Sequence, residues 1–252
     1  MAGVPFGLYW EEQVRTEPYM GRRIGTPIIC RGLACMLILS VIGVAFPLEA
    51  CVPLQSTERE SLRNSDLVEL IRLDPTLKLD MRYASSNNFL GRPVYPEARA
   101  FLQRPAAEAL VRAHQGLEGQ GYGLLVFDAY RPWSVSKLFW DKTPAEKKRF
   151  VANPKAGSRH NRGCAVDLTL FDLRSGQEVA MPSAFDEFSE RAYRDYEGGT
   201  EEARHLRGLL RIAMESEGFR VNEFEWWHFD YEDWRDYPIL DLSFCEIGEA
   251  DP

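Results

Sequence analysis

The chain has 252 residues, 45% of them hydrophobic and 12% aromatic, enough material for one core of about 200 residues. Its formal net charge of −8 at pH 7 argues against a nucleic-acid-binding protein, because such proteins carry a basic surface. A small zwitterionic substrate is compatible with this charge. The arginines are scattered along the sequence rather than clustered, and no internal repeat, coiled-coil heptad or phosphate-binding glycine loop is present.

An apolar run near the N-terminus has the character of a secretory signal. Residues 33–46 are apolar apart from Ser40 and Gly43, and Arg31 is one of the basic residues that precede them. The run is shorter than the roughly twenty residues of a membrane-spanning helix, and it matches the apolar region of a signal peptide. The alternative is a buried hydrophobic helix in a cytoplasmic protein.

A cysteine follows the apolar run. Leu48 to Cys51 resembles a lipoprotein box, with Glu49 where a small residue is usual. We expect residues 1–51 to be an N-terminal extension with an export signal, and residues 52–252 to form one domain. The protein is then expected in the periplasm or cell envelope, with lipidated Cys51 or an uncleaved signal as a means of membrane attachment. A start at Met20 would give a signal of more ordinary length.

Hydrophobic periodicity predicts the regular elements of the domain. The expected strands are residues 77–83, 122–127 and 164–170, with a hairpin formed by 168–173 and 178–181. The expected helices are residues 104–117, a short one through Phe150 that begins at a capping box from Thr143 to Glu146, and 201–217. His114 lies on the apolar face of the first helix, and we expect it to pack there rather than bind a ligand.

The stretch from Ser158 to Leu170 places a histidine in a turn and a carboxylate inside an apolar strand. Apolar residues alternate from Cys164 onward, so Asp167 lies in the middle of the strand. A buried ionised carboxylate is costly unless a cation meets it, and a metal ion held jointly with His160 would be that cation. The alternative is that Asp167 pairs with an arginine and His160 is a loop residue.

A second candidate stretch is the aromatic run from Phe224 to Tyr231, in which Glu225 and His228 lie three residues apart. Residues at this spacing point to opposite faces of a regular strand, so we expect Glu225 in a turn or bulge that enters the strand. His160, Asp167 and His228 supply three nitrogen and oxygen ligands, the number typical of a catalytic zinc site with an open fourth position. Glu225 would carry a proton from water to a leaving amine, unless it is a surface residue.

These stretches carry two motifs. They are Ser-x-His-x-x-Gly-x-Ala-x-Asp from Ser158 to Asp167 and Glu-Trp-Trp-His from Glu225 to His228. They resemble the motifs of the zinc D-alanyl-D-alanine dipeptidases of vancomycin resistance. The resemblance covers residues 66–237. It extends to Asp128-Ala-Tyr-Arg-Pro132, to Tyr83, to Asn88-Phe89 and to Phe185-Asp186.

The resemblance implies a single-domain α+β zinc-peptidase fold with a central, mostly antiparallel sheet and flanking helices. Some D,D-carboxypeptidases and the hedgehog signalling domain share this fold, so the fold alone does not define a function. The resemblance also implies one zinc ion per chain, held by His160, Asp167 and His228, with Glu225 as general base. Residues 52–252 would then be the catalytic domain.

The same resemblance implies residues that act on the substrate. Arg131 would stabilise the charge of the transition state, and the alternative is an ion pair with Asp128 at the surface. Asp186 would bind the ammonium group of the substrate, and the alternative is an ordinary loop aspartate. Tyr83 and Ser158 are expected to contribute to substrate binding.

The activity implied is hydrolysis of the D-alanyl-D-alanine dipeptide to two D-alanines, as part of cell-wall peptide metabolism. One alternative is a zinc D,D-carboxypeptidase that trims peptidoglycan stem peptides, which would need a pocket open at the amino end of the substrate. Another is a non-catalytic zinc-binding sensing module, which would need neither Glu225 nor Arg131. The sequence does not distinguish resistance, recycling and nutrition, and it leaves the oligomeric state open.

Overall fold

A sheet of five strands lies at the centre of residues 62–249, the part of the chain that the computed structural model describes. The strand order is β2-β4-β5-β7-β6, and every pair is antiparallel except β2 with β4. The strands are β2 (Lys78–Leu79), β4 (Tyr122–Asp128), β5 (Ala165–Asp172), β6 (Phe219–Val221) and β7 (His228–Tyr231). The α+β class and the mostly antiparallel sheet are confirmed. The expected export signal and Cys51 lie outside the described residues.

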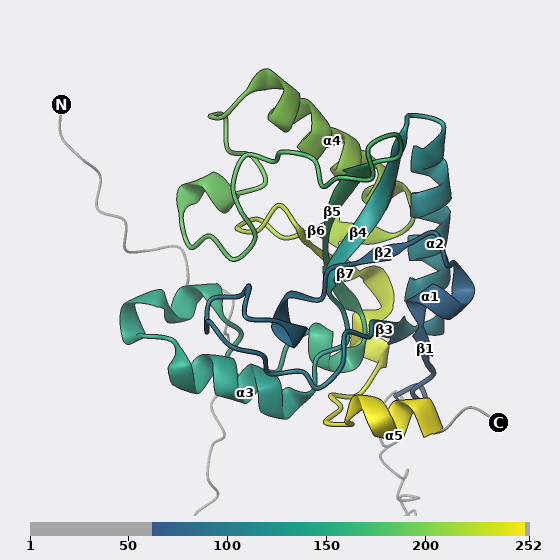
Figure 1. The fold of residues 1–252 in the computed structure, drawn as a ribbon. Coiled ribbons are helices and arrows are strands. Elements are labelled where there is room, and N and C mark those ends of the chain that lie inside the picture. The colour runs from purple at the N-terminus through teal and green to yellow at the C-terminus, as the bar shows by residue number, and fades with distance from the viewer. Residues whose placement is uncertain (1–61, 250–252) are drawn as a thin grey trace, which may run out of the picture. The chain divides into compact units, whose positions relative to one another are not determined.

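Helices and a small second sheet surround the central one (Figure 1). The second sheet pairs β1 (Leu67–Glu69) with β3 (Phe101–Gln103). The helices are α1 (Leu70–Leu73), α2 (Arg104–Glu118), α3 (Trp133–Lys142), α4 (Glu201–Ser216) and α5 (Phe244–Glu249). Short 3-10 helices span Arg82–Ala84, Ala145–Phe150, His160–Arg162, Glu190–Ala192 and Glu232–Asp236. Within the described residues, no helix is long and apolar enough to cross a membrane.

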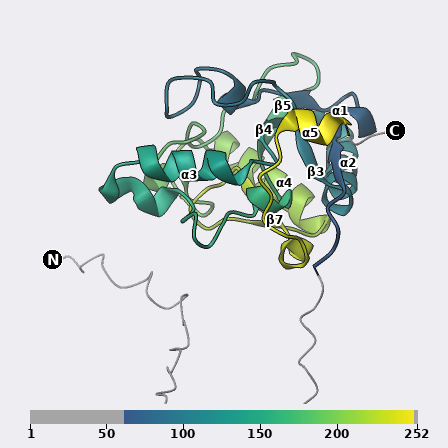
Figure 2. The same cartoon turned by 90° about the horizontal axis from the view of Figure 1, so that it is seen from below.

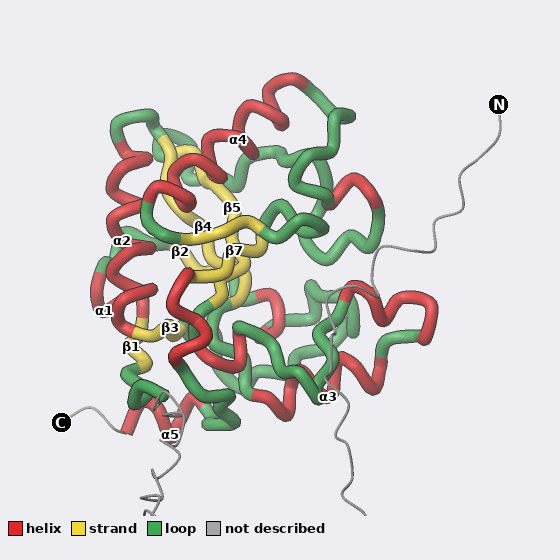
Figure 3. Tube along the Cα trace, turned by 180° about the vertical axis from the view of Figure 1, so that it is seen from behind, coloured by secondary structure: helices red, strands yellow, loops and turns green. Residues whose placement is uncertain are grey.

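The two longest helices pack side by side against the sheet. Helix α2 contacts β4, and α4 contacts α2, β5 and β6. Seen from behind in Figure 3, both lie beside the strands, and α3 lies at the opposite end of the domain from α4. Figure 2 shows α3 and α5 at that end from below.

The sequence explains why these two helices form. Helix α2 has a proline in its first turn and buries an apolar face that includes Leu110, Ala113 and Leu117. Helix α4 begins at Thr200, whose hydroxyl accepts a hydrogen bond from the Ala203 amide at 3.1 Å. Both helices were predicted, and both are confirmed to within a residue or two at their ends.

Strand β5 is the middle of the sheet and is buried almost throughout. Its apolar residues Val166, Leu168 and Leu170 are fully buried in the core. Asp167 lies between them in sequence and points to the other face, as the alternation predicted. The strand therefore carries a buried carboxylate at its centre.

The predicted strand over residues 77–83 is wrong in length. Strand β2 has two residues and pairs only with β4, and the Asp80 amide donates to the Val126 carbonyl just after it. The chain then leaves the sheet in a 3-10 turn that contains Tyr83. The Tyr83 ring packs edge-on against Phe89 and Phe185, and these aromatic contacts replace strand pairing.

Two other predictions need correction. The capping box at Thr143 is wrong, because its hydroxyl donates to the Phe139 carbonyl at 2.8 Å at the end of α3, a helix that was not predicted. Residues 145–150 form a 3-10 helix without a side-chain cap. The predicted hairpin is shorter than expected: Phe171 and Glu178 form an isolated bridge, and the Asp172 carboxylate accepts hydrogen bonds from the turn amides of Arg174 and Ser175.

Candidate metal centre and active site

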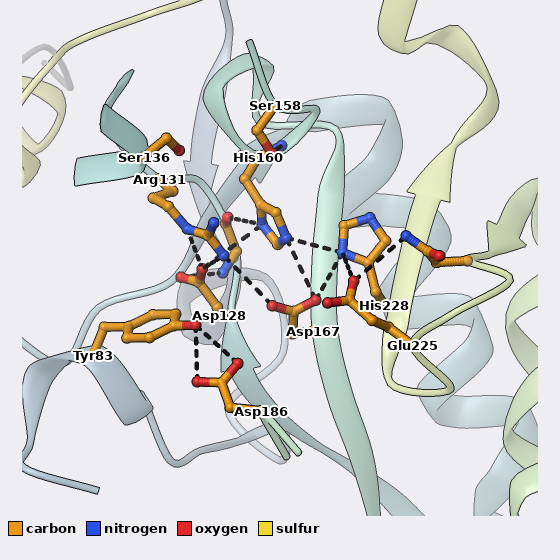
Figure 4. A network of polar contacts seen from close by, with 12 residues as sticks. Tyr83, Asp128, Arg131, Ser136, Ser158, His160, Asp167, Asp186, Glu225 and His228 are labelled. Carbon is orange, nitrogen blue, oxygen red and sulfur yellow. Dashed lines mark hydrogen bonds and ion pairs between the residues drawn. The ribbon is translucent and has the colours of Figure 1, made fainter. Parts of the chain in front are cut away.

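Three side chains from two strands and a turn converge at one point (Figure 4). Asp167 on β5 and His228 on β7 are directly opposite each other in the antiparallel register, so both point to the same face. His160 comes from the 3-10 turn before β5, which ends at Gly163 with a positive φ of 66°. A side chain at Gly163 would be strained and would collide with Leu67. All three converging side chains are buried.

The separations of the donor atoms fit a metal ion. Nδ1 of His228 lies 2.9 Å from Oδ1 of Asp167 and 3.1 Å from Nε2 of His160. Nε2 of His160 lies 3.4 Å from Oδ1 of Asp167. Tetrahedral zinc with bonds of about 2.0–2.1 Å separates its ligand atoms by about 3.3 Å. Two imidazoles and one carboxylate would supply three of the four ligands of a tetrahedral zinc ion.

Hydrogen bonds on the far side of each imidazole assign its tautomer. Nδ1 of His160 donates to the Ala129 carbonyl at 2.7 Å, and Nε2 of His228 donates to Oδ1 of Asp230 at 2.9 Å. The lone pairs of the other two ring nitrogens are therefore free to bind a cation at the convergence point. Sequence reasoning missed Asp230. The signal was its position two residues after His228, which places both on one face of β7.

Asp167 is ionised in this setting. Burial raises the pKa of its carboxyl group, but His160 and His228 outweigh burial and hold that pKa below its usual range. The carboxylate is thus ready to act as an anionic ligand. The alternative role, pairing with an arginine, is a minor one, because Nη2 of Arg131 is 3.7 Å from Oδ2 of Asp167.

Glu225 lies beside the cluster in a turn that enters β7. The His228 amide donates to the Glu225 carbonyl at 3.2 Å and closes this turn, so the predicted irregularity is confirmed. Oε2 of Glu225 lies 3.9 Å from Nδ1 of His228, and Asn222 donates to it at 3.4 Å. Removal from water raises the pKa of Glu225 to about 7. A carboxyl group with such a pKa exchanges protons readily near neutral pH.

Comparison with known proteins agrees with this geometry. Residues 63–245 match the profile of the peptidase M15 family, described as D-ala-D-ala dipeptidase. The chain belongs to this family. It is 34% identical to the D-alanyl-D-alanine dipeptidase of Escherichia coli K12 over 185 residues, which cover 73% of this chain and 94% of that one. It is 36% identical to the Enterococcus faecalis enzyme of the same name over 188 residues, covering 67% and 92%.

Among solved structures, the chain is similar to the vancomycin resistance D,D-dipeptidase VanXYg in complex with a D-Ala-D-Ala phosphinate analog. The sequence identity is 19%, the TM-score is 0.36, and the match covers 54% of this chain and 53% of that one. The family assignment confirms the resemblance that the motifs indicated. It also confirms zinc as the cofactor, which the donor set on His160, Asp167 and His228 fits.

In this member of the peptidase M15 family, a buried carboxylate holds Arg131 in place. Nε and Nη2 of Arg131 donate to Oδ2 of Asp128 at 2.8 and 2.6 Å. The guanidinium also lies over the rings of Tyr83 and Phe139, with distances of 5.3 and 4.9 Å to the ring centroids. The pair with Asp128 exists, but it is not at the surface, because both side chains are buried.

An irregularity in the sheet places Asp128. The register between β4 and β5 shifts between Val126 and Asp128, so Asp128 lies opposite Asp167. Oδ1 of Asp128 accepts hydrogen bonds from the Tyr95 hydroxyl at 2.8 Å and from the Ala129 amide at 3.0 Å. The carboxylate is thus fully bonded and anchors the guanidinium beside the metal cluster.

Asp186 and Tyr83 form a second polar pair near the cluster (Figure 4). The Tyr83 hydroxyl lies 3.2 and 3.1 Å from the two carboxyl oxygens of Asp186. Asp186 has a positive φ of 57°, which is uncommon for a residue other than glycine. Removal from water, followed by the charges of Asp167 and Glu225, raises the pKa of Asp186 to about 8. Figure 4 shows the Asp186 side chain beside Tyr83 on the side of Asp167.

Ser158 and Asn161 shape the turn that presents His160. Oγ of Ser158 accepts a hydrogen bond from the His160 amide at 3.2 Å, and Oδ1 of Asn161 accepts one from the Ser158 amide at 2.8 Å. Nδ2 of Asn161 donates to the Arg131 carbonyl at 2.7 Å. Ser158 therefore positions His160, and its predicted contact with substrate stays a prediction. Sequence reasoning missed Asn161, because the Arg131 carbonyl that its amide group binds lies 30 residues earlier in the chain.

Two other reactive side chains are structural. His114 is buried, as predicted for a packing residue: Nδ1 accepts from the Leu124 amide at 2.9 Å, and Nε2 lies 3.0 Å from the Thr76 hydroxyl. Burial raises the pKa of the Cys164 thiol to about 12, so it stays protonated and is a poor nucleophile. Cys164 and Cys245 do not form a disulfide with each other.

Proposed function

We propose that the protein is a zinc-dependent dipeptidase that hydrolyses D-alanyl-D-alanine to two D-alanines. The observation that carries this proposal is the convergence of His160, Asp167 and His228 with the carboxyl group of Glu225 beside them. This arrangement, in a chain of the D-ala-D-ala dipeptidase family, supports hydrolysis rather than metal storage. A sensing module would have no use for Glu225 or for the buried Arg131.

We assign the chemistry as follows. When zinc is bound by the two histidines and Asp167, it supplies Lewis acidity and makes water more acidic. Glu225 accepts a proton from the attacking water as the new carbon–oxygen bond forms. It then delivers that proton to the leaving amine nitrogen as the carbon–nitrogen bond breaks. A pKa of about 7 lets one carboxyl group serve in both steps.

Arg131 stabilises the negative charge that develops on the substrate's carbonyl oxygen. Its guanidinium faces the metal cluster, with Nη2 3.7 Å from Oδ2 of Asp167, and Asp128 and the aromatic rings hold it in one orientation. A fixed donor in a site removed from water needs little reorganisation during the reaction. Asp128 is therefore a positioning residue for Arg131.

Asp186 is the group that we assign to the ammonium end of the dipeptide. A carboxyl group with a pKa of about 8 loses its proton when a cation binds next to it, so a free amino group is recognised by charge. The Tyr83 hydroxyl bonds to Asp186 and orients it. This recognition distinguishes a dipeptidase from a carboxypeptidase, whose substrate continues beyond that position.

The test compares three substrates with the purified, zinc-loaded protein: D-Ala-D-Ala, L-Ala-L-Ala and N-acetyl-D-Ala-D-Ala. We expect rapid release of alanine from the first only, with the acylated dipeptide slower by about 10² or more, because Asp186 would be left desolvated and unpaired. Asp186→Asn should lose activity on the free dipeptide and change little on the acylated one. Equal rates of the wild-type protein on free and acylated substrates would instead indicate a carboxypeptidase.

We also propose that residues 1–51 direct export to the periplasm or cell envelope. The support is the basic flank and apolar run in the sequence. Fractionation of cells that express the full chain tests the proposed location. Palmitate labelling of wild type and of Cys51→Ser tests lipidation. Label that depends on Cys51 would establish a lipoprotein, and an intact N-terminus in the cytosolic fraction would refute export.

A further inference from the structure

A cavity away from the three converging side chains includes Trp226, the residue after Glu225, in its lining. Its volume is about 140 Å³, and it is formed between helix α4, the loop before that helix and the end of β6. The lining residues are Arg194, Asp195, Arg204, Arg207, Gly208, Arg211, Val221 and Trp226. Arg204, Arg207 and Arg211 share one face of α4, and Arg194 joins them from the preceding loop, although the protein as a whole is acidic.

The positive charge in this cavity is only partly neutralised. Asp195 is the one carboxylate in the lining, and it pairs with Arg194 at 3.0 Å and with Arg211 at 3.2 Å. Nε of Arg211 also lies 3.2 Å from Glu215. Asp195 and Glu215 therefore neutralise part of the charge of Arg194 and Arg211.

The other two arginines bond to backbone carbonyl groups. Arg204 donates to the Gly199 carbonyl at 2.9 Å, and Arg207 donates to the carbonyl groups of Tyr193 and Tyr196 at 3.3 and 2.8 Å. Within residues 62–249, neither has a carboxylate within ion-pair distance. Removal from water lowers the pKa of the Arg207 guanidinium, the charge of Asp195 raises it, and the positive charges of Arg204 and Arg211 lower it further. An anion placed here would relieve this repulsion.

We propose that this cavity is a binding site for a phosphate-type oxyanion, either free inorganic phosphate or the phosphate group of a larger molecule. The planar guanidinium group matches phosphate oxygens in a two-point contact, and several arginines around one anion add charge-assisted hydrogen bonds. The lining carries four guanidinium groups and one carboxylate, so the local charge favours an anion although the protein as a whole is acidic.

The site connects to the metal centre through backbone hydrogen bonds. The Arg194 amide donates to the Glu223 carbonyl at 3.2 Å, and the Trp226 amide donates to the Ala192 carbonyl at 2.8 Å. These two bonds flank Glu225 in the sequence. A bound oxyanion that joins Arg194 to α4 would stiffen the turn that holds Glu225. Binding of the anion itself does not depend on the proposed peptidase activity.

Gly208 offers a direct test, because it lines the cavity and a Cβ atom added there meets nothing within 4 Å. Gly208→Glu places a carboxylate among the arginines, and Gly208→Ala is the matched control in the same helix. Isothermal titration with inorganic phosphate, at constant ionic strength set with chloride, should show saturable binding to wild type and to Gly208→Ala. Binding should be at least tenfold weaker in Gly208→Glu. Equal binding to both variants, or no binding to wild type by any probe below, would overturn the proposal.

A second pair of variants separates the cavity from the general surface. Arg204→Gln removes an arginine of the lining, and Arg220→Gln removes an exposed one in neighbouring β6. We expect only Arg204→Gln to weaken phosphate binding. Equal losses of phosphate affinity in both variants would indicate a general effect of surface charge and would contradict a site in the cavity. Glycerol 3-phosphate and phosphatidylglycerol vesicles, titrated in the same way, identify the source of the phosphate group. Any of the three probes whose binding is lost in Gly208→Glu supports the site.

Discussion

Asp230 accepts a hydrogen bond from Nε2 of His228 at 2.9 Å, and both residues lie on the same face of β7. The bond leaves Nδ1 of His228 free and directs it toward Asp167 and His160. Oδ2 of Asp230 also lies 3.4 Å from Nε of Arg159. One strand therefore supplies both a metal ligand and the residue that orients it, an arrangement that raises the basicity of the ligand.

Variants of this pair should affect the metal to different degrees. His228→Ala removes a ligand, so the purified protein should contain little zinc. Asp230→Asn keeps the ligand but loses the negative partner, so its zinc affinity should fall by about 10–100-fold. Elemental analysis and competition with a chelator measure both. Full zinc occupancy in His228→Ala would contradict the assignment of the site.

Glu225→Gln should separate proton transfer from metal binding. The amide cannot accept the proton of water, so turnover should fall by about 10²–10⁴-fold. Zinc content should stay at the wild-type level, because Glu225 is not among the three converging ligands. Measurement of kcat and of zinc on the same preparation distinguishes the roles. Loss of both together would make Glu225 a ligand.

Arg131 is expected to act on the transition state more than on substrate binding. Arg131→Lys keeps a positive charge opposite Asp128 but loses the planar guanidinium group that donates two hydrogen bonds to it. We therefore expect kcat to fall by about 10²–10³ with a smaller change in KM. Arg131→Ala should also destabilise the fold, by about 3–5 kcal/mol, because Asp128 would be left buried and unpaired. Steady-state kinetics and thermal unfolding measure the two effects. A change in KM alone would move Arg131 to substrate binding.

His114 should make folding sensitive to acid. Its burial lowers the pKa of the imidazole below the unfolded value of about 6.5, so between the two values the unfolded chain binds more protons. The contribution of neutral His114 to stability is complete when the pH is above the pKa of His114 in the unfolded chain. It decreases as the pH falls toward the pKa of His114 in the folded protein. Urea unfolding measured from about pH 7 to pH 5 gives the free energy of unfolding at each pH. This free energy should decrease less with falling pH in His114→Gln than in wild type. His205→Gln, at an exposed position of α4, is the control, and an unchanged pH dependence in His114→Gln would refute this role.

Local patterns in the sequence determined much of the site. The alternation of apolar residues placed Asp167 inside a strand, and the three-residue spacing of Glu225 and His228 required a turn between them. Helices α2 and α4 followed from their apolar period. These features depend on neighbours within a few residues, which is why the sequence alone predicts them.

Tertiary structure decided the features that depend on distant partners. The bulge that turns Asp128 toward Arg131 exists only because β4 pairs with β5, and the 3-10 turn at Tyr83 forms because aromatic contacts replace an edge strand. Arg194 joins the arginines of α4 in one cavity only because α4 packs beside the loop that precedes it. Hydrogen bonds, ring contacts and burial between segments far apart in the chain set these positions, and no local period in the sequence records them.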